Sequence, residues 1–150
     1  MHKHRLQQMQ ALARVRGLAE QRAELVTQQA AQALRHANDL LQEANDRVDA
    51  ATRWKAGSAV AAGLRLGLYE QALVSEQVLS VAAESADSTR SRVRQAHEQS
   101  REQLLQASRA LEVAQRRLQR GTRAAADAME RKQSDDAADL WLSRKLHADR

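Results

Sequence analysis

The sequence contains no cysteine, no proline and no phenylalanine, and its aromatic share is only 2%. Without cysteine, neither a disulfide framework nor a thiolate zinc site can form. Aromatic side chains contribute much of the buried area in globular cores, so their scarcity leaves no material for a thick core. The opening segment MHKHRLQQMQ lacks an apolar block, and a run of about 18 apolar residues occurs nowhere. We therefore expect a soluble cytoplasmic protein with neither a secretory signal nor a membrane-spanning helix.

Glycine is also scarce, and its distribution predicts the fold. Three of the five glycines lie within the segment WKAGSAVAAGLRLGLYE, whereas the flanking sequence is rich in helix formers. One break predicts an all-α protein with two long helices, at about 3–56 and 66–147, joined by a turn at about 57–65. We expect them to form an antiparallel coiled-coil hairpin as a single domain over residues 1–150, with a longer second helix that has an unpaired C-terminal extension.

Apolar and small residues recur at alternating intervals of three and four, which is the heptad pattern of a coiled coil. In the first helix the pattern predicts the core positions Ala23, Val26, Ala30, Ala33, Ala37, Leu40, Ala44, Arg47, Ala51 and Trp54. In the second helix it predicts Ala72, Ser75, Leu79, Ala82, Ala86, Thr89, Val93, Ala96 and Ser100, followed by Leu104, Ala107, Leu111, Ala114, Leu118, Gly121, Ala125 and Ala128. The step of four from Ser100 to Leu104 predicts a stutter that locally unwinds the supercoil.

The position of the turn predicts which residues lie side by side. A turn near residue 60 pairs residues whose numbers add up to about 120, so residue 3 would lie opposite residue 117. The second helix would then have no intramolecular partner from about Gly121 onward. An isolated helix of that length is marginal in water, so we expect this part to fray when free and to become ordered on binding.

The C-terminal part of the sequence carries an apolar stripe of its own. After Ala128 the heptad positions become charged, at Lys132, Asp135 and Asp139. The stripe consists of Ala138, Trp141, Leu142 and Leu146. Tryptophan is enriched among the residues that contribute most to binding, so this stripe is a candidate anchor for a partner. The alternative is that this part folds back on the coiled coil or that its apolar side chains are simply exposed.

Basic residues are concentrated in one segment. Residues 90–123 hold nine Lys and Arg against three Asp and Glu, and the net charge of +5 comes from this segment. Within it, Arg109, Arg116 and Arg123 recur every seven residues on the face opposite the predicted core positions. Such a surface indicates an acidic partner, and a solvated face that keeps an alanine-rich coiled coil in solution has the same pattern.

No motif of the sequence indicates catalysis. The five histidines are scattered, and none has a carboxylate four residues away as in a metal-binding helix: they are His2, His4, His36, His97 and His147. The segment GSAVAAG lacks the lysine and the preceding strand of a phosphate-binding loop. We expect no enzymatic activity, no metal or other cofactor, and no small-molecule substrate.

Three parts of the sequence together resemble a known family. They are the segment RLQQMQALARVRGLAEQRAE, the glycine-containing turn between a long and a longer helix, and the ending MERKQSDDAADLWLSRK. They resemble the FliJ/YscO family, the coiled-coil stalk proteins of flagellar and virulence type III secretion systems. The resemblance implies a non-enzymatic protein that inserts into the ring of the secretion ATPase, contacts the export gate and, as in several members, escorts export chaperones. It also implies a cytoplasmic location at the base of a membrane-embedded apparatus, which the protein reaches only through its partners.

The resemblance also implies which residues meet each partner. For the ATPase ring the candidates are Arg109, Arg116, Arg120 and Arg123, together with Ala138, Trp141, Leu142 and Leu146. For the export gate the candidates lie nearer the turn and are Leu41 and Val48, which form a seven-residue row with Leu34, and the aromatic residues Trp54 and Tyr69.

Two other functional classes stay open at this stage. An excess of arginine favours a basic coiled coil that binds nucleic acid, but acidic residues are mixed with the basic ones and no aromatics are interleaved for base stacking, so we expect no nucleic-acid partner. A chaperone or scaffold coiled coil without a role in export has the same sequence pattern. Heptads also allow two chains to pair as an extended dimer, which the glycine cluster disfavours.

Overall fold

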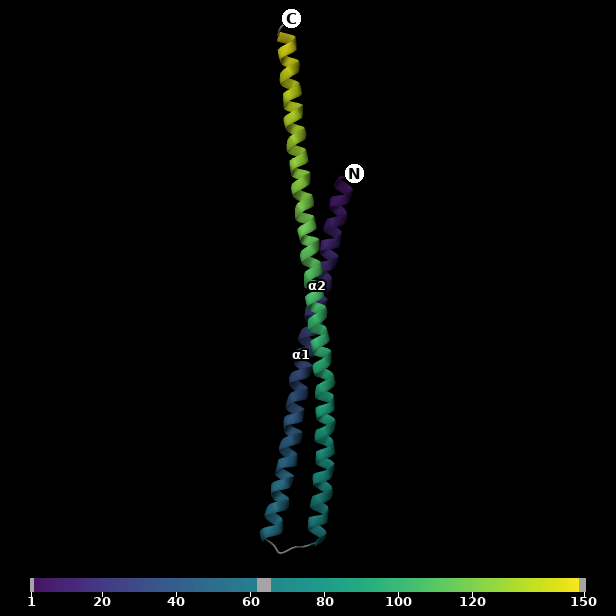
Figure 1. The fold of residues 1–150 in the computed structure, drawn as a ribbon, viewed down its shortest axis with the longest axis vertical. Helices are drawn as coiled ribbons and strands as arrows, with labels where there is room; N and C mark the ends of the chain where they lie inside the picture. The colour runs from purple at the N-terminus through teal and green to yellow at the C-terminus, as the bar shows by residue number, and fades with distance from the viewer. Residues whose placement is uncertain (1, 62–65, 149–150) are drawn as a thin grey trace. The chain divides into compact units, whose positions relative to one another are not determined.

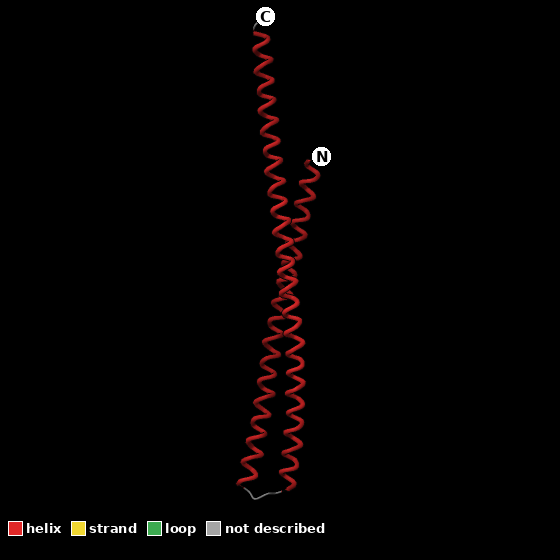
Figure 2. Tube along the Cα trace, viewed as in Figure 1, coloured by secondary structure: helices red, strands yellow, loops and turns green. Residues whose placement is uncertain are grey.

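The computed structural model describes residues 2–61 and 66–148, and all of them are helical. Helix α1 spans His2–Ala61 and helix α2 spans Leu66–Ala148 (Figure 1). Figure 2 shows the same two helices and no strand in the described part of the chain. The predicted all-α class with two long helices that pack against each other is confirmed.

Helix α1 continues five residues beyond its predicted end at residue 56. Gly57 lies inside the helix, and a Cβ added there would meet no heavy atom within 4 Å. A single glycine destabilises a helix by about 1 kcal/mol relative to alanine, and helix formers such as Ala56 and Ala59 nearby offset this effect. The rest of the predicted turn, residues 62–65, lies outside the described residues.

The contacts between the helices group into two compact units. Unit 1 comprises Met1–Arg22 and Leu105–Arg150, and unit 2 comprises Ala23–Leu104. Both helices run through both units, so each unit contains one segment of α1 and one segment of α2. The single domain expected over residues 1–150 stays a prediction.

In unit 1 the two segments run antiparallel. The Ser108 hydroxyl donates a hydrogen bond to Glu20 Oε1 at 3.0 Å. Gly121 comes later in α2 than Ser108, and it lies against Met9, which comes earlier in α1 than Glu20: a Cβ added to Gly121 would lie 2.9 Å from Met9 Sδ. The predicted register, which placed residue 3 opposite residue 117, is therefore wrong by about two helical turns, because α1 extends further than the sequence predicted.

In unit 2 the segments also run antiparallel, and half of the predicted core positions are confirmed. In α1 the confirmed positions are Ala23, Ala30, Ala37, Ala44 and Ala51. The remaining five predicted core positions of α1 are exposed: Val26, Ala33, Leu40, Arg47 and Trp54. In each case the next residue along the chain is partly buried instead: Thr27, Leu34, Leu41, Val48 and Lys55.

The same displacement occurs in the unit 2 segment of α2. Its partly buried positions include Glu76, Ala83 and His97, each one residue after the predicted Ser75, Ala82 and Ala96, which are exposed. The other predicted positions are buried or partly buried and are confirmed: Ala72, Leu79, Ala86, Thr89, Val93 and Ser100. Because His97 precedes Ser100 by three residues, the following step of four to Leu104 continues the regular heptad. The predicted stutter is therefore wrong.

The core positions of unit 1 agree better with the prediction. In α2 the confirmed positions are Ala107, Leu111, Ala114, Leu118, Gly121 and Ala125, whereas Ala128 is exposed. The α1 residues with reduced exposure at corresponding intervals are Leu6, Met9, Ala13, Gly17 and Glu20. Small residues at these positions let the helices approach closely, but each buries little apolar area.

Only small side chains are buried among the described residues. The buried apolar residues are Ala37, Ala72 and Ala114, and Ser100 is the buried polar residue. The Ser100 hydroxyl donates to the carbonyl of His97 at 2.8 Å, and the Thr27 hydroxyl lies 3.1 Å from the Ser100 carbonyl, to which it donates. The buried Ser100 hydroxyl and the partly buried Thr27 hydroxyl are therefore both satisfied, as the interior of a helix pair requires.

An ion pair joins the two helices of unit 2 near the C-terminal end of α1 and the N-terminal end of α2. Lys55 Nζ donates to Glu76 Oε2, and the Thr52 hydroxyl donates to Glu76 Oε1 at 3.2 Å. Both charged side chains retain 23% of their exposure. The hydrogen bond from Lys55 lowers the pKa of Glu76 from its ordinary value of 4.5, and the same bond raises the pKa of Lys55 from 10.5.

This pair should make stability depend on pH at both ends of the scale. Because the pKa of Glu76 is lowered by folding, its contribution is present above pH 4.5 and is lost as the pH falls below that value. Because the pKa of Lys55 is raised, its contribution is present below pH 10.5 and is lost above it. Urea unfolding followed by circular dichroism should show both losses in the wild type and neither in Glu76→Gln. Glu70→Gln, which removes an exposed carboxylate from the same helix, should keep both.

Two glycines should respond differently to alanine. Gly57→Ala meets open space inside α1, so it should raise the free energy of unfolding by about 0.5–1 kcal/mol. Gly121→Ala offers the same gain in helix propensity but forces Met9 to move, so it should stabilise clearly less. Chemical unfolding of both variants measures the difference. Equal stabilisation would show that Met9 does not pack against Gly121 in solution.

Candidate interaction surface

The last part of α2 has no packing partner among the described residues. Ala125 is partly buried, whereas every residue of 126–148, named the tail here, is exposed. Figure 1 shows α2 continuing as one helix past the N-terminal end of α1. The unpaired extension predicted from the sequence is confirmed, but it begins after Ala125 and not at Gly121, because Gly121 lies against Met9 and Leu6.

The tail presents the apolar side chains that the sequence predicted as a partner anchor. Trp141, Leu142 and Leu146 are 60%, 51% and 70% exposed. Ala138 is exposed as well. Leu140 is a further exposed apolar residue that the predicted stripe omitted, because it lies off the three-and-four spacing. Single exposed leucines are common on proteins, but several large apolar side chains within one short helical segment mark an interaction surface.

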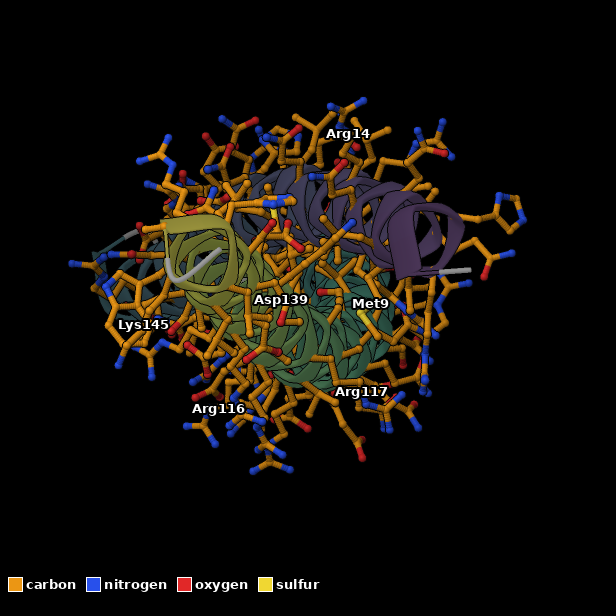
Figure 3. The ribbon with its side chains drawn as sticks, turned by 90° about the horizontal axis from the view of Figure 1, so that it is seen from above. Met9, Arg14, Arg116, Arg117, Asp139 and Lys145 are labelled. Atoms are coloured by element: carbon orange, nitrogen blue, oxygen red, sulfur yellow. The ribbon has the colours of Figure 1, made fainter. Side chains whose placement is uncertain are left out.

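Charged side chains flank these apolar residues. Lys145 Nζ lies 5.0 Å from the centroid of the Trp141 ring, which is a cation–π arrangement one helical turn apart. Figure 3 looks along the helices and shows Lys145 and Asp139 on different sides of the tail helix. The tail therefore has a cationic side beside Trp141 and an anionic side that carries Asp139.

The four predicted arginines are all exposed and, at intervals of seven, four and three residues, they share one face of α2. Arg116 pairs with Glu112 along α2, and no hydrogen bond or ion pair among the described residues involves Arg109, Arg120 or Arg123. The seven-residue spacing of the sequence therefore selected exposed side chains correctly, although it did not show which of them share a surface with α1.

A shallow hollow of unit 1 brings a different set of arginines together. Its lining residues are Leu12 and Arg16 of α1 and Arg109, Ala110, Val113, Ala114 and Arg117 of α2. Its volume of about 280 Å³ is below the range of roughly 300–1,000 Å³ typical of small-molecule sites. The hollow can therefore accept one or two side chains of a protein partner against an apolar floor with a basic rim. Of these residues Arg109 was predicted as a partner contact, Arg16 as part of the basic end of the first helix and Ala114 as a core position, whereas the hollow itself depends on how the two helices pair.

The candidates for export-gate contacts lie in unit 2 and differ in exposure. Leu41 and Val48 are partly buried core positions of the helix pair, and Tyr69 is also partly buried. Trp54 is 56% exposed. Of these four residues, Trp54 is therefore the most accessible to a partner.

Sequence reasoning missed an exposed row of valines on α2. Val74, Val78 and Val81 are more than half exposed and are spaced by four and three residues, so they share one face of the helix. β-Branched residues are weak helix formers, so three valines on an exposed face of a helix are unusual. The heptad pattern considers core positions alone and therefore did not reveal this row.

No cluster of metal-binding side chains accompanies these surfaces in the described part of the chain. Within residues 2–61 and 66–148, no three metal-binding side chains come close enough to share an ion. Neither described helix contains a segment that is long and apolar enough to cross a bilayer. Comparison with known proteins gave no match to a family model, a curated protein or a solved structure. A function for this chain therefore has to be inferred from its own surfaces.

Removal of the tail should leave the stability of the helix pair unchanged. A chain that ends at residue 125 loses only exposed residues, so in dilute solution its thermal midpoint should stay within about 2 °C of the full chain. A chain that ends at residue 117 also loses the packing of Leu118, Gly121 and Ala125, so its midpoint should fall. Thermal unfolding by circular dichroism tests both. A lower midpoint for the first truncation would mean that the tail packs on the helix pair.

Proposed function

We propose that the protein is a non-enzymatic stalk protein of a bacterial type III secretion system. In this role it engages the ring of the secretion ATPase through the tail and contacts the export gate through unit 2. It acts in the cytoplasm, at the base of the membrane-embedded apparatus, and export chaperones are further partners. The observation that carries the proposal is the tail, a helix with no intramolecular partner that exposes Trp141, Leu142 and Leu146.

The dimensions of the tail support insertion into a ring. A single helix with its side chains is about 10–12 Å wide, whereas a pair of packed helices is about twice as wide in one direction. The tail can therefore enter a central opening that excludes the two-helix part of unit 1. Arg120 and Arg123 are exposed where the pairing with α1 ends, so they would meet acidic groups at the rim of such an opening.

The exposure of each side chain indicates which candidate residues of unit 2 could contact the export gate directly. Trp54 and the row of Val74, Val78 and Val81 offer accessible apolar surface. Leu41 and Val48 lie at core positions, so a contribution from them to gate binding would act through the packing of the helix pair. Alanine variants of these two residues would therefore need a stability measurement beside any binding measurement.

Truncation of the anchor side chain should weaken binding to the purified secretion ATPase. Trp141→Ala removes a large exposed side chain at the centre of the apolar stripe, so the dissociation constant should rise about 30-fold, as expected for a side chain worth about 2 kcal/mol. Binding of the full-length protein can be measured by biolayer interferometry. Arg116→Glu combined with Arg120→Glu and Arg123→Glu should abolish co-purification.

The matched control is Leu140→Ala, which removes an exposed apolar side chain of the tail outside the stripe. It should bind the ATPase as the wild type does. The proposal would be overturned if Trp141→Ala and the arginine variants bound with unchanged affinity, or if the wild type did not bind at all.

A further inference from the structure

One face of α2 changes from basic to acidic along its unit 1 segment. Residues spaced by three, four or seven positions share a helix face, and the face that passes through the hollow continues into the tail. We name it the pairing face, and its residues are Gln106, Ala110, Val113, Arg117, Ala124, Ala128, Arg131, Asp135, Asp139, Leu142 and Leu146. All of these except Ala110, which is partly buried, are exposed.

The two ends of the pairing face carry opposite charge. Arg117 lies at one end, beside Arg16 and Arg109 at the rim of the hollow, and Asp135 and Asp139 lie at the other. None of the ion pairs among the described residues involves any of these five side chains. Both ends thus combine unpaired charge with exposed apolar groups.

The spacing of the two ends is also matched. Read forward, Gln106, Ala110, Val113 and Arg117 follow at intervals of four, three and four residues. Read backward, Leu146, Leu142, Asp139 and Asp135 follow at the same intervals. Two antiparallel helices can therefore bring these positions face to face over their whole length, as in other antiparallel helix pairs.

The two ends cannot meet within one molecule. Val113 and Leu142 lie on the same continuous helix, and at 1.5 Å per residue they are about 40 Å apart along it. An occupant of the hollow that has the complementary charge and spacing is therefore available from this sequence only in a second copy.

We propose that two copies of the chain pair antiparallel along the pairing face, about a two-fold axis beside residue 126 of α2. This axis places Arg117 opposite Asp135 of the second copy and Ala110 opposite its Leu142. Ala124 and Ala128 lie opposite each other near the axis, where small side chains permit close approach. Each contact occurs twice, so the arrangement closes as a dimer and leaves no free end for further growth.

The dimer shares Leu142 and Leu146 with the proposed partner anchor, but it does not use Trp141. Trp141 is one residue from Leu142 and is therefore turned by about 100° around the helix, away from the pairing face. Arg109 and Arg117 can each form bidentate hydrogen bonds with a carboxylate, while Leu142 enters the hollow beside Val113. This inference does not rest on the secretion role, because the dimer needs only the chain itself.

Sedimentation equilibrium of the full-length protein tests the dimer. At low salt the wild type should show a monomer–dimer equilibrium that shifts toward monomer as salt is raised. Arg109→Asp with Arg117→Asp should weaken dimerisation at least about tenfold, and so should Asp135→Arg with Asp139→Arg. All four substitutions in one chain should restore the dimer, because the acid at position 117 then faces a base at position 135, and the new acid at 109 lies about one helical turn from the position opposite the new base at 139. Arg92→Asp, an exposed position of unit 2 with the same change of charge, should have no effect.

A cross-linking experiment tests the face directly, because the chain has no cysteine of its own. Ala128→Cys places one thiol per copy on the pairing face near the axis, so a short bis-maleimide should link two copies. Ala126→Cys lies two residues away, on the far side of the helix, and should not be linked. A protein that is monomeric at all concentrations, a dimer that neither charge variant weakens, or equal linking of both cysteine variants would overturn the proposal.

These measurements use the protein alone, so they are independent of the ATPase experiments. Trp141→Ala should dimerise as the wild type does, even though it should lose the ATPase. A dimer without ATPase binding would refute the secretion role and leave the pairing intact, and ATPase binding by a strictly monomeric chain would refute the pairing only.

Discussion

The packing of small side chains is the constraint on which both units depend. Alanine at alternate core positions of α1 lets the helices approach closely, but a row of identical small residues fits its partner almost equally well after a shift of one heptad. Polar contacts across the helix pair remove that ambiguity, because a shift would leave them unpaired. Ser108 with Glu20 acts in this way in unit 1, and Lys55 with Glu76 does so in unit 2.

Several polar residues of the helix pair, among them Glu76 of the register-setting ion pair, are the ones that sequence reasoning misplaced. The helices and the alanine half of the core could be predicted, since alanine recurs every seven residues and the glycine cluster marks the break. Glu76, Arg90 and His97 resemble surface residues, whereas their neighbours Ser75 and Ala96 resemble core residues. An interface of only two helices leaves most core positions partly open to water, so long polar side chains can bury their stems there.

Of the interaction surfaces, too, one could be predicted from the sequence and one could not. The exposed tail could be predicted because a count of residues on either side of the break shows which helix is longer. The hollow could not, because Leu12 and Arg16 are about a hundred residues from Val113 in the sequence and meet it only in the observed register. The tail then presents two different sides, one with Trp141 beside Lys145 and one with Asp135 and Asp139, but Leu142 and Leu146 belong to both the partner anchor and the pairing face. The two associations therefore compete for these leucines, and a tail paired with a second copy is too wide for an opening that admits one helix only.

The two tryptophans fall one in each unit, Trp54 in unit 2 and Trp141 in the tail of unit 1, and both are more than half exposed. With no phenylalanine and one tyrosine in the chain, nearly all of its ultraviolet absorption and emission comes from these two rings. Replacement of either one by phenylalanine leaves a single intrinsic fluorophore. The protein thus contains its own optical probes, one that reads the part of the helix pair near the turn and one that reads occupancy of the tail, with no added label.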